Sequence, residues 1–132
     1  MNIATRQIKV ARIVSVIDAG KIMNPLTARS QIQGSIVWGI GMALLERTDW
    51  DYSLGHPVTR NLADYLVPVN AGIPDIKVEF TNYPDLEFNS IGVRGIGEIG
   101  ITGTVAAVAN AVYNATGIRV RDLPLTLDKI LS

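Results

Sequence analysis

The 132-residue chain is long enough for one compact domain and too short for two, and its 48% hydrophobic residues are sufficient for a packed core, so a single domain over residues 1–132 is expected. Twelve basic and twelve acidic residues cancel, and no basic run occurs, which excludes the broad positive surface of a nucleic-acid-binding protein. With no Cys and one His, the sequence predicts no disulfide and no protein-ligated metal ion.

The longest apolar run, residues 35–45, is well short of the roughly 20 residues that cross a bilayer, so a buried helix is expected rather than a membrane anchor. The first residues lack the apolar core and cleavage site of a signal peptide. A cytoplasmic location is the resulting expectation, and a periplasmic one would require an export signal on a partner.

Taken in chain order, the first predicted element is a strand over residues 8–18, which is rich in Ile and Val and ends in an Asp-Ala-Gly turn. A helix should begin at Asn24 and Pro25, because Asn caps helices and Pro suits the first helical position. The apolar residues of this helix recur at every fourth position: Ile32, Ile36, Ile40 and Leu44. Its interior glycines cost about 1 kcal/mol each relative to Ala, which indicates close packing of another backbone or of a cofactor. They are Gly34, Gly39 and Gly41.

The second half of the chain mixes strand and helix signals. Residues 48–56 predict a turn or short hairpin, and residues 61–69 are compatible with either a short helix or an extended segment. Alternation over residues 76–81 predicts a half-buried strand. Residues 104–117 predict a buried helix closed by a glycine, and residues 118–132 a brief strand, a Pro turn and a last helical turn. The expected fold class is α/β (α+β), with a small mixed sheet and two long buried helices.

Residues 91–104, IGVRGIGEIGITGT, place a single carboxylate, Glu98, among five glycines. The segment from Gly95 to Gly100 matches the G-x-G-x-x-G dinucleotide fingerprint. The polar residues before Gly95 do not form the strand that this motif requires, and Glu98 would face a pyrophosphate. A Rossmann site is therefore rejected.

Two interpretations of Glu98 remain open from the residues alone. In one, the glycines form a tight loop and Glu98 points to water or caps the next helix. In the other, Glu98 lines a pocket, where its apolar neighbours Ile96 and Ile99 would raise its pKa and suit it to general-base catalysis. The glycines would then let a bulky ligand reach the main-chain N–H groups.

The loop KIMNPLT, residues 21–27, also allows two interpretations. It is either an ordinary capped helix start or an anion site, in which the helix N-terminus and Lys21 attract a phosphate. Gln31 follows Asn24 by about two helical turns on the same face, and it offers a donor and an acceptor to a polar ring system.

Together these stretches resemble the C-terminal end of the molybdopterin-binding (large) subunit of the xanthine oxidase/aldehyde oxidoreductase family. The likeness runs from VIDAGKIMNPLTARSQIQGSIVWGIGMALLE through RNLADYLVP and SIGVRGIGEIGITGTVAAVANAVYNATGIRVRDLP to LTLDKIL. The chain is most similar to the bacterial aldehyde oxidoreductases that use molybdopterin cytosine dinucleotide.

The resemblance implies a role for each stretch. Glu98 matches the glutamate of the family's K/R-G-x-G-E motif and would act as the general base next to molybdenum. The implied reaction oxidises aldehydes or N-heteroaromatic compounds with water as the oxygen source. Cofactor contacts are implied for Lys21, Ile22, Met23, Asn24, Pro25, Leu26, Thr27, Gln31, Arg94, Gly95, Ile96 and Gly97.

The chain departs from the family in length, because complete subunits are several times longer. The resemblance implies three partners: the remaining part of the molybdenum subunit, an iron–sulfur subunit and an FAD subunit. The chain alone is expected to be inactive. The alternative is a non-catalytic assembly module of the same fold that covers its exposed apolar surface by self-association.

Overall fold

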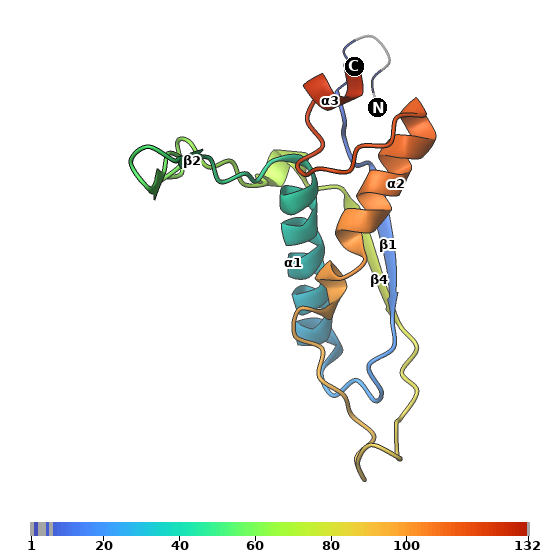
Figure 1. The fold of residues 1–132 in the computed structure, drawn as a ribbon. Helices are drawn as coiled ribbons and strands as arrows, with labels where there is room; N and C mark the ends of the chain where they lie inside the picture. Colours follow the sequence, from blue (N-terminus) through green and yellow to red (C-terminus); the bar gives the residue numbers. More distant parts are fainter. Residues whose placement is uncertain (1, 3–4, 6, 132) are drawn as a thin grey trace.

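The computed structural model describes residue 2, residue 5 and residues 7–131. Its elements follow the order shown in Figure 1: β1 (Arg12–Ile17), α1 (Pro25–Leu44), β2 (Trp50–Asp51), β3 (His56–Pro57), the 3-10 helix η1 (Asn70–Gly72), β4 (Asp75–Phe80), the 3-10 helix η2 (Ile99–Ile101), α2 (Thr104–Thr116) and α3 (Asp128–Leu131). None of the helices in this described part has the length and apolar character of a transmembrane span.

Strands β1 and β4 form a parallel pair although α1 and a projecting arm, which carries the β2–β3 hairpin, separate them in the chain (Figure 1). Arg12 lies opposite Asp75, and the register continues to Ile17 opposite Phe80. One face of this pair packs on α1, where Ile32, Ile36 and Ile40 are buried against Val78. The predicted spacing of four in α1 is confirmed, and both predicted strands are present, although the first begins at Arg12 rather than at residue 8.

Helix α1 begins where the sequence predicts, because Asn24 caps it. The Asn24 Oδ1 accepts the N–H groups of Leu26 at 3.1 Å and Thr27 at 3.2 Å, and Pro25 takes the first helical position. The resulting helix presents its apolar stripe to the sheet.

Two interior glycines of α1 allow close packing. A Cβ on Gly39 would lie 2.7 Å from the Cβ of Thr104, so this glycine admits the start of α2. A Cβ on Gly41 would lie 2.9 Å from Pro68 Cδ, which passes over the end of the helix. A Cβ on Gly34 would have no neighbouring atom within 4 Å. Two of the three glycines therefore allow close packing, but the atoms that approach them belong to side chains, so the prediction that another backbone approaches is wrong at these positions.

Helix α2 ends at Gly117, whose φ of 75° is the left-handed conformation of a glycine C-cap. The prediction that this helix is buried is wrong. Its buried residues are Thr104, Val108 and Val112, which lie on one face. Val108 and Val112 join Ala43, Leu125 and Ile130 in a core cluster, whereas the opposite face of the helix is exposed.

The combination of helices with a small amount of sheet confirms the predicted fold class, but the arrangement of the strands differs from the prediction. The strands form two separate pairs, parallel β1–β4 and the antiparallel hairpin β2–β3, rather than one mixed sheet. Residues 61–69 form turns and extended chain instead of a helix. Residues 118–121 form no strand, because no described strand pairs with them, and the following segment is held by the end of α1, where Leu125 N–H donates to Ala43 O at 2.7 Å.

Candidate functional site

The loop before α1 and the loop before Glu98 are joined by backbone pairing. Lys21 N–H donates to Gly92 O at 2.7 Å, and Arg94 N–H donates to Ala19 O at 3.1 Å. Gly20 lies between these bonds with φ of 66°, and a Cβ there would overlap the Gly92 carbonyl. The two stretches that the sequence singles out are therefore one structural unit.

Asn89 holds the second of these loops, and the sequence interpretation missed it. Its Oδ1 accepts the N–H groups of Ile91 at 3.1 Å, Gly92 at 2.9 Å and Val93 at 3.3 Å. Its Nδ2 donates to Val93 O at 2.7 Å. An Asn followed three residues later by Gly is a turn signal that could have identified this role.

Two other missed residues fix the first loop to the end of β4. Asn82 Oδ1 accepts the N–H of Ile22 at 3.0 Å, and Asp18 Oδ1 accepts the hydroxyl of Thr81 at 2.9 Å. Asn82 adopts φ of 50°, a left-handed conformation that Asn tolerates better than most residues. These contacts set where the loop over residues 21–24 begins.

The side chain of Arg94, a predicted cofactor contact, binds its own loop. Its Nε donates to Asp85 Oδ2 at 2.6 Å, its Nη2 pairs with the same oxygen, and its guanidinium lies 4.9 Å from the centre of the Phe88 ring. The hydrogen bond from Arg94 lowers the pKa of Asp85 below its ordinary value. Arg94 therefore shapes the loop that leads to Glu98.

Glu98 is exposed and lies at the N-cap position directly before η2. Its carbonyl accepts the N–H of Ile101 at 3.0 Å, but its side chain makes no capping hydrogen bond, which removes the helix-capping interpretation. Gly100 packs against α1, with its Cβ position 3.1 Å from Ile32 O, and so keeps the start of η2 beside that helix. The apolar enclosure needed for a tuned general base is not supplied by this chain alone.

The backbone before Glu98 is open to contact with another molecule. In the described part of the chain, the N–H groups of residues 95–98 have no hydrogen-bond partner. A Cβ on Gly95 or Gly97 would meet no atom within 4 Å. Gly97 has a φ of 42°, a left-handed conformation that favours glycine over other residues. Neither the backbone conformation nor the packing of this chain requires a glycine at position 95. Residues 82–98 contain no strand that leads into Gly95, which agrees with the rejection of a Rossmann site.

The start of α1 offers fewer donors to an anion than the sequence suggests. The N–H groups of Leu26 and Thr27 are taken by Asn24 Oδ1, and Pro25 has none. What remains for an anion is the helix dipole, the exposed Lys21 side chain and the N–H groups of Met23 and Asn24, for which the described residues supply no acceptor. The other predicted contacts in this stretch are also exposed, except for the half-buried Ile22: Met23, Asn24, Pro25, Leu26, Thr27 and Gln31.

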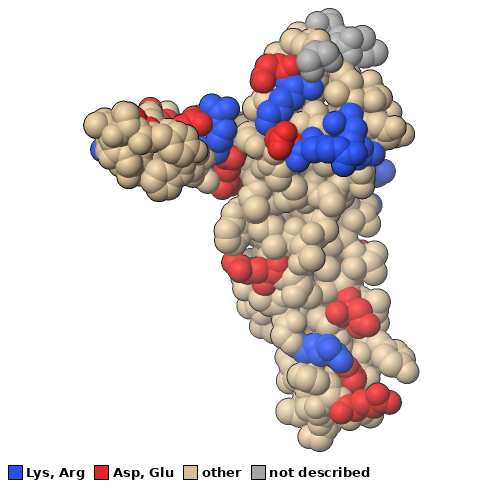
Figure 2. Space-filling view, viewed as in Figure 1, with Lys and Arg blue, Asp and Glu red and all other residues tan. Residues whose placement is uncertain are grey.

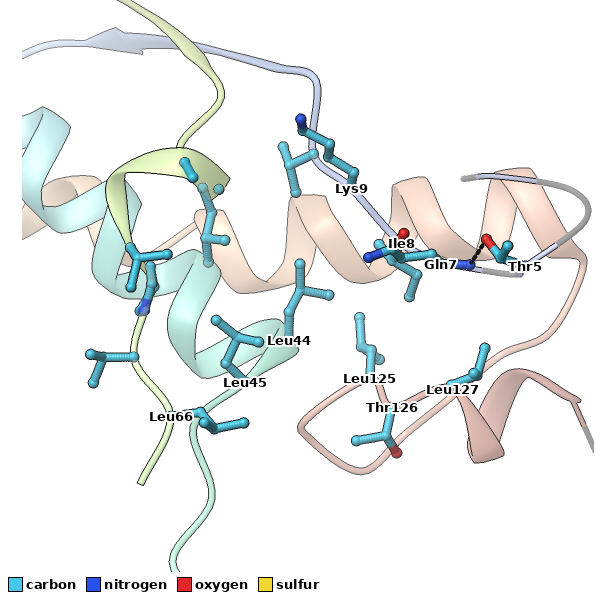
Figure 3. A pocket seen from close by; sticks show the side chains of 17 residues that line it. Thr5, Gln7, Ile8, Lys9, Leu44, Leu45, Leu66, Leu125, Thr126 and Leu127 are labelled. Atoms are coloured by element: carbon cyan, nitrogen blue, oxygen red, sulfur yellow. Dashed lines mark hydrogen bonds between the residues drawn. The ribbon is translucent and has the colours of Figure 1, made fainter. Parts of the chain in front are cut away.

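A hollow of about 1070 Å³ lies at the opposite end of α1 (Figure 3). Apolar side chains from separate segments line it, including Leu44, Leu45, Leu66 and Leu125 (Figure 3). None of the predicted site residues borders this hollow. Among the described residues, no group of three or more His, Cys, Asp and Glu side chains could hold a metal ion.

Comparison with known proteins gives consistent matches. The family model described as molybdopterin cofactor-binding domain matches residues 1–74. The aldehyde oxidoreductase molybdenum-binding subunit PaoC of Escherichia coli K12 is 49% identical over 97% of this chain. The structure of quinoline 2-oxidoreductase from Pseudomonas putida 86 superposes with a TM-score of 0.86 at 30% identity over 97% of the chain. The aldehyde oxidoreductase of Desulfovibrio desulfuricans gives 0.84 at 35% identity, also over 97%.

The chain is much shorter than these proteins. It spans 18% of the length of PaoC, 16% of the quinoline enzyme chain and 14% of the Desulfovibrio chain. The matched fold is therefore one part of each of these larger chains.

Proposed function

Because this chain belongs to the molybdopterin cofactor-binding domain family, we propose that residues 1–132 form the C-terminal part of the molybdenum-binding domain of a molybdenum hydroxylase. The proposed reaction oxidises aldehydes or N-heteroaromatic compounds with water as the oxygen source. Molybdopterin cytosine dinucleotide would supply the redox chemistry when bound. The observation that carries the proposal is the run of free N–H groups over residues 95–98, which ends at the carboxylate-bearing residue.

In this proposal Glu98 is the general base. Its exposed carboxylate makes no helix cap, so an Oε atom is available to accept a proton from a water-derived nucleophile. The N–H groups of Gly95, Ile96 and Gly97 would donate to polar atoms of the cofactor, and Lys21 would face a phosphate. The start of α1 and Gln31 complete the proposed cofactor surface.

The remaining part of the subunit has to supply the rest of the pocket, because Glu98 is open to solvent in this chain. PaoC is named as a subunit of an aldehyde oxidoreductase, which supports association with further chains. Iron–sulfur and FAD subunits are the proposed electron-transfer partners.

Complementation tests the proposal. The chain would be co-expressed with PaoC from which the matching segment has been deleted. A complex is expected that contains stoichiometric molybdenum by mass spectrometry, releases CMP on hydrolysis and oxidises an aromatic aldehyde.

A Glu98→Gln variant then tests the base. It should lower turnover by about 10²- to 10⁴-fold while the molybdenum content stays unchanged. Glu87→Gln, which neutralises an exposed carboxylate in the adjoining loop, is the matched control and should retain turnover. Full turnover by the Glu98→Gln complex, or a complex without molybdenum, would contradict the proposal.

Exposed apolar side chains favour a second candidate, a non-catalytic assembly module. Val16 on the sheet, Tyr52 on the arm and Tyr83 after β4 are 66%, 92% and 76% exposed. Figure 2 shows charged side chains in small separate groups, with much of the visible face uncharged. Surface of this kind marks contact with another molecule. A stable oligomer of the chain alone in sedimentation velocity, which acquires no molybdenum on complementation, would favour this candidate.

A further inference from the structure

We propose that the outer edge of β1 and the adjacent face of α2 form a docking groove for an extended strand from the remaining part of the molybdenum-binding subunit. The identity of the strand's source rests on the proposed function. The groove itself follows from the pairing of the sheet and from the small side chains of α2.

The β1–β4 ladder shows which main-chain groups of β1 are unpaired. Asp75 N–H donates to Ala11 O at 3.2 Å, and Thr81 N–H donates to Ile17 O at 3.1 Å. Alternate residues of a strand direct their N–H and C=O groups to opposite edges, so the intervening residues point away from β4. These are Arg12, Val14 and Val16, for which the described part of the chain offers no partner strand.

The two edges of the sheet are not equivalent. On the outer edge of β4, Val78 O accepts a hydrogen bond from Arg29 Nη1 at 2.6 Å, so a side chain from α1 occupies the middle of that edge. On the outer edge of β1, the described residues make no hydrogen bond to the main chain of Arg12, Val14 or Val16, and in Figure 1 no further strand lies beside it. Parallel sheets are normally extended and covered, and an open edge is a template for an added strand.

A groove of about 450 Å³ lies along this edge. Residues 8–14 form one wall, and the other wall is built from α2 residues Ala107, Val108, Ala111, Val112 and Ala115. Three of these are exposed alanines at a spacing of four, so no long side chain from that stripe of α2 obstructs the path. The small residues leave room for a strand beside β1.

The charges of the groove argue against a second copy of this chain as the occupant. Lys9 and Arg12 line the groove, and its lining contains no acidic residue. Pairing two β1 edges would bring these cations together, which is unfavourable. An apolar strand that carries an acidic residue fits the groove better. The chain spans 18% of PaoC, so most of a complete subunit is available to supply such a strand.

Amide hydrogen exchange tests the proposal directly. In the chain alone, the amides of Arg12, Val14 and Val16 should exchange fast, while those of Ile13, Ser15 and Ile17, which face β4, should be protected. In the complex with the shortened PaoC, the first three amides should exchange at least about 10-fold more slowly than in the chain alone.

Each other outcome overturns the proposal in a distinguishable way. A molybdenum-containing complex in which these amides stay unprotected would rule out strand docking in the groove and would leave the proposed function intact. Protection in the chain alone, together with self-association, would identify a second copy as the occupant. Failure to form any complex would remove the proposed function and, with it, the proposed source of the strand.

Two pairs of variants separate edge pairing from general destabilisation. Val14→Pro removes an outward N–H and leaves the ladder with β4 intact, so it should weaken association with the shortened PaoC at least 10-fold, whereas Val14→Ala, which keeps the N–H, should not. Ala111→Trp fills the groove from α2, and Ala106→Trp places the same side chain on the helix outside it. If Val14→Pro fails to fold, the comparison of Ala111→Trp with Ala106→Trp tests the proposal instead. Equal affinity of the two Trp variants would overturn the proposal.

Discussion

Lys21 donates its backbone N–H to the carbonyl oxygen of Gly92 over 2.7 Å, although α1, the arm and β4 separate the two residues in the chain. This bond joins the loop that starts α1 to the loop that leads to Glu98. The position of Glu98 relative to α1 therefore depends on a short backbone pairing and on the packing of Gly100, since the carboxylate itself is exposed.

Gly20→Ala should destabilise the chain. The residue has φ of 66°, and a Cβ would overlap the Gly92 carbonyl. A non-glycine residue in such a conformation costs roughly 1–3 kcal/mol, so the free energy of unfolding in urea should fall by about that amount. Gly34→Ala is the matched control, because Gly34 lies in α1 with nothing within 4 Å of its Cβ position. It should gain about 0.5–1 kcal/mol, and equal behaviour of the two variants would contradict the expectation.

Asn89→Ala should loosen the turn that presents Gly92. The substitution removes four hydrogen bonds from a half-buried side chain, which should lower the free energy of unfolding by about 1–3 kcal/mol. Asn89→Asp keeps an acceptor for the three N–H groups and loses only the donor to Val93 O. A smaller loss is therefore expected for the Asp variant in urea denaturation. Equal losses would show that the acceptor is not what holds the turn.

The ion pair between Arg94 and Asp85 should make stability depend on acid pH. The hydrogen bond from Arg94 lowers the pKa of Asp85 in the folded chain, so its contribution is present above the ordinary Asp pKa of about 3.9 and is lost as pH falls through the lower folded value. Unfolding monitored between neutral and strongly acid pH should show a shallower loss for Asp85→Asn than for the unsubstituted chain. Asp51 and Asp128 also have lowered pKa values, so only the difference between the two curves reports on Asp85. Superimposable pH profiles would refute this role.

Local signals in the sequence were sufficient for the elements that local contacts create. Asn24 and Pro25 mark the start of α1, and Gly117 marks the end of α2, because each acts on its own helix terminus. The pairing of Gly20 with Val93 involves residues far apart in the chain, and nothing local predicts it. The apolar composition of α2 suggested burial, but a pattern of apolar residues does not indicate which molecule covers them.

The glycines around Glu98 show the same distinction. Gly92 has φ of 74° and lies against Pro84, and Gly100 lies against Ile32, so the chain's own structure accounts for both. Gly95 has neither a left-handed φ nor a close neighbour. The sequence presents these glycines as equivalent. The structure identifies Gly95, next to the unpaired N–H groups of residues 95–98, as a position where an added side chain could exclude an outside ligand.

Gly95→Val should therefore separate cofactor binding from folding. A Cβ at this position meets nothing within 4 Å, so the free energy of unfolding should stay within about 0.5 kcal/mol of the unsubstituted chain. In the complex with the shortened PaoC, molybdenum per complex should fall, because the side chain would stand where the cofactor approaches the main chain. Gly72→Val is the control, since Gly72 is equally open but belongs to η1 and borders the hollow at the other end of α1. Unchanged molybdenum content in the Gly95→Val complex would show that the cofactor does not lie against this backbone.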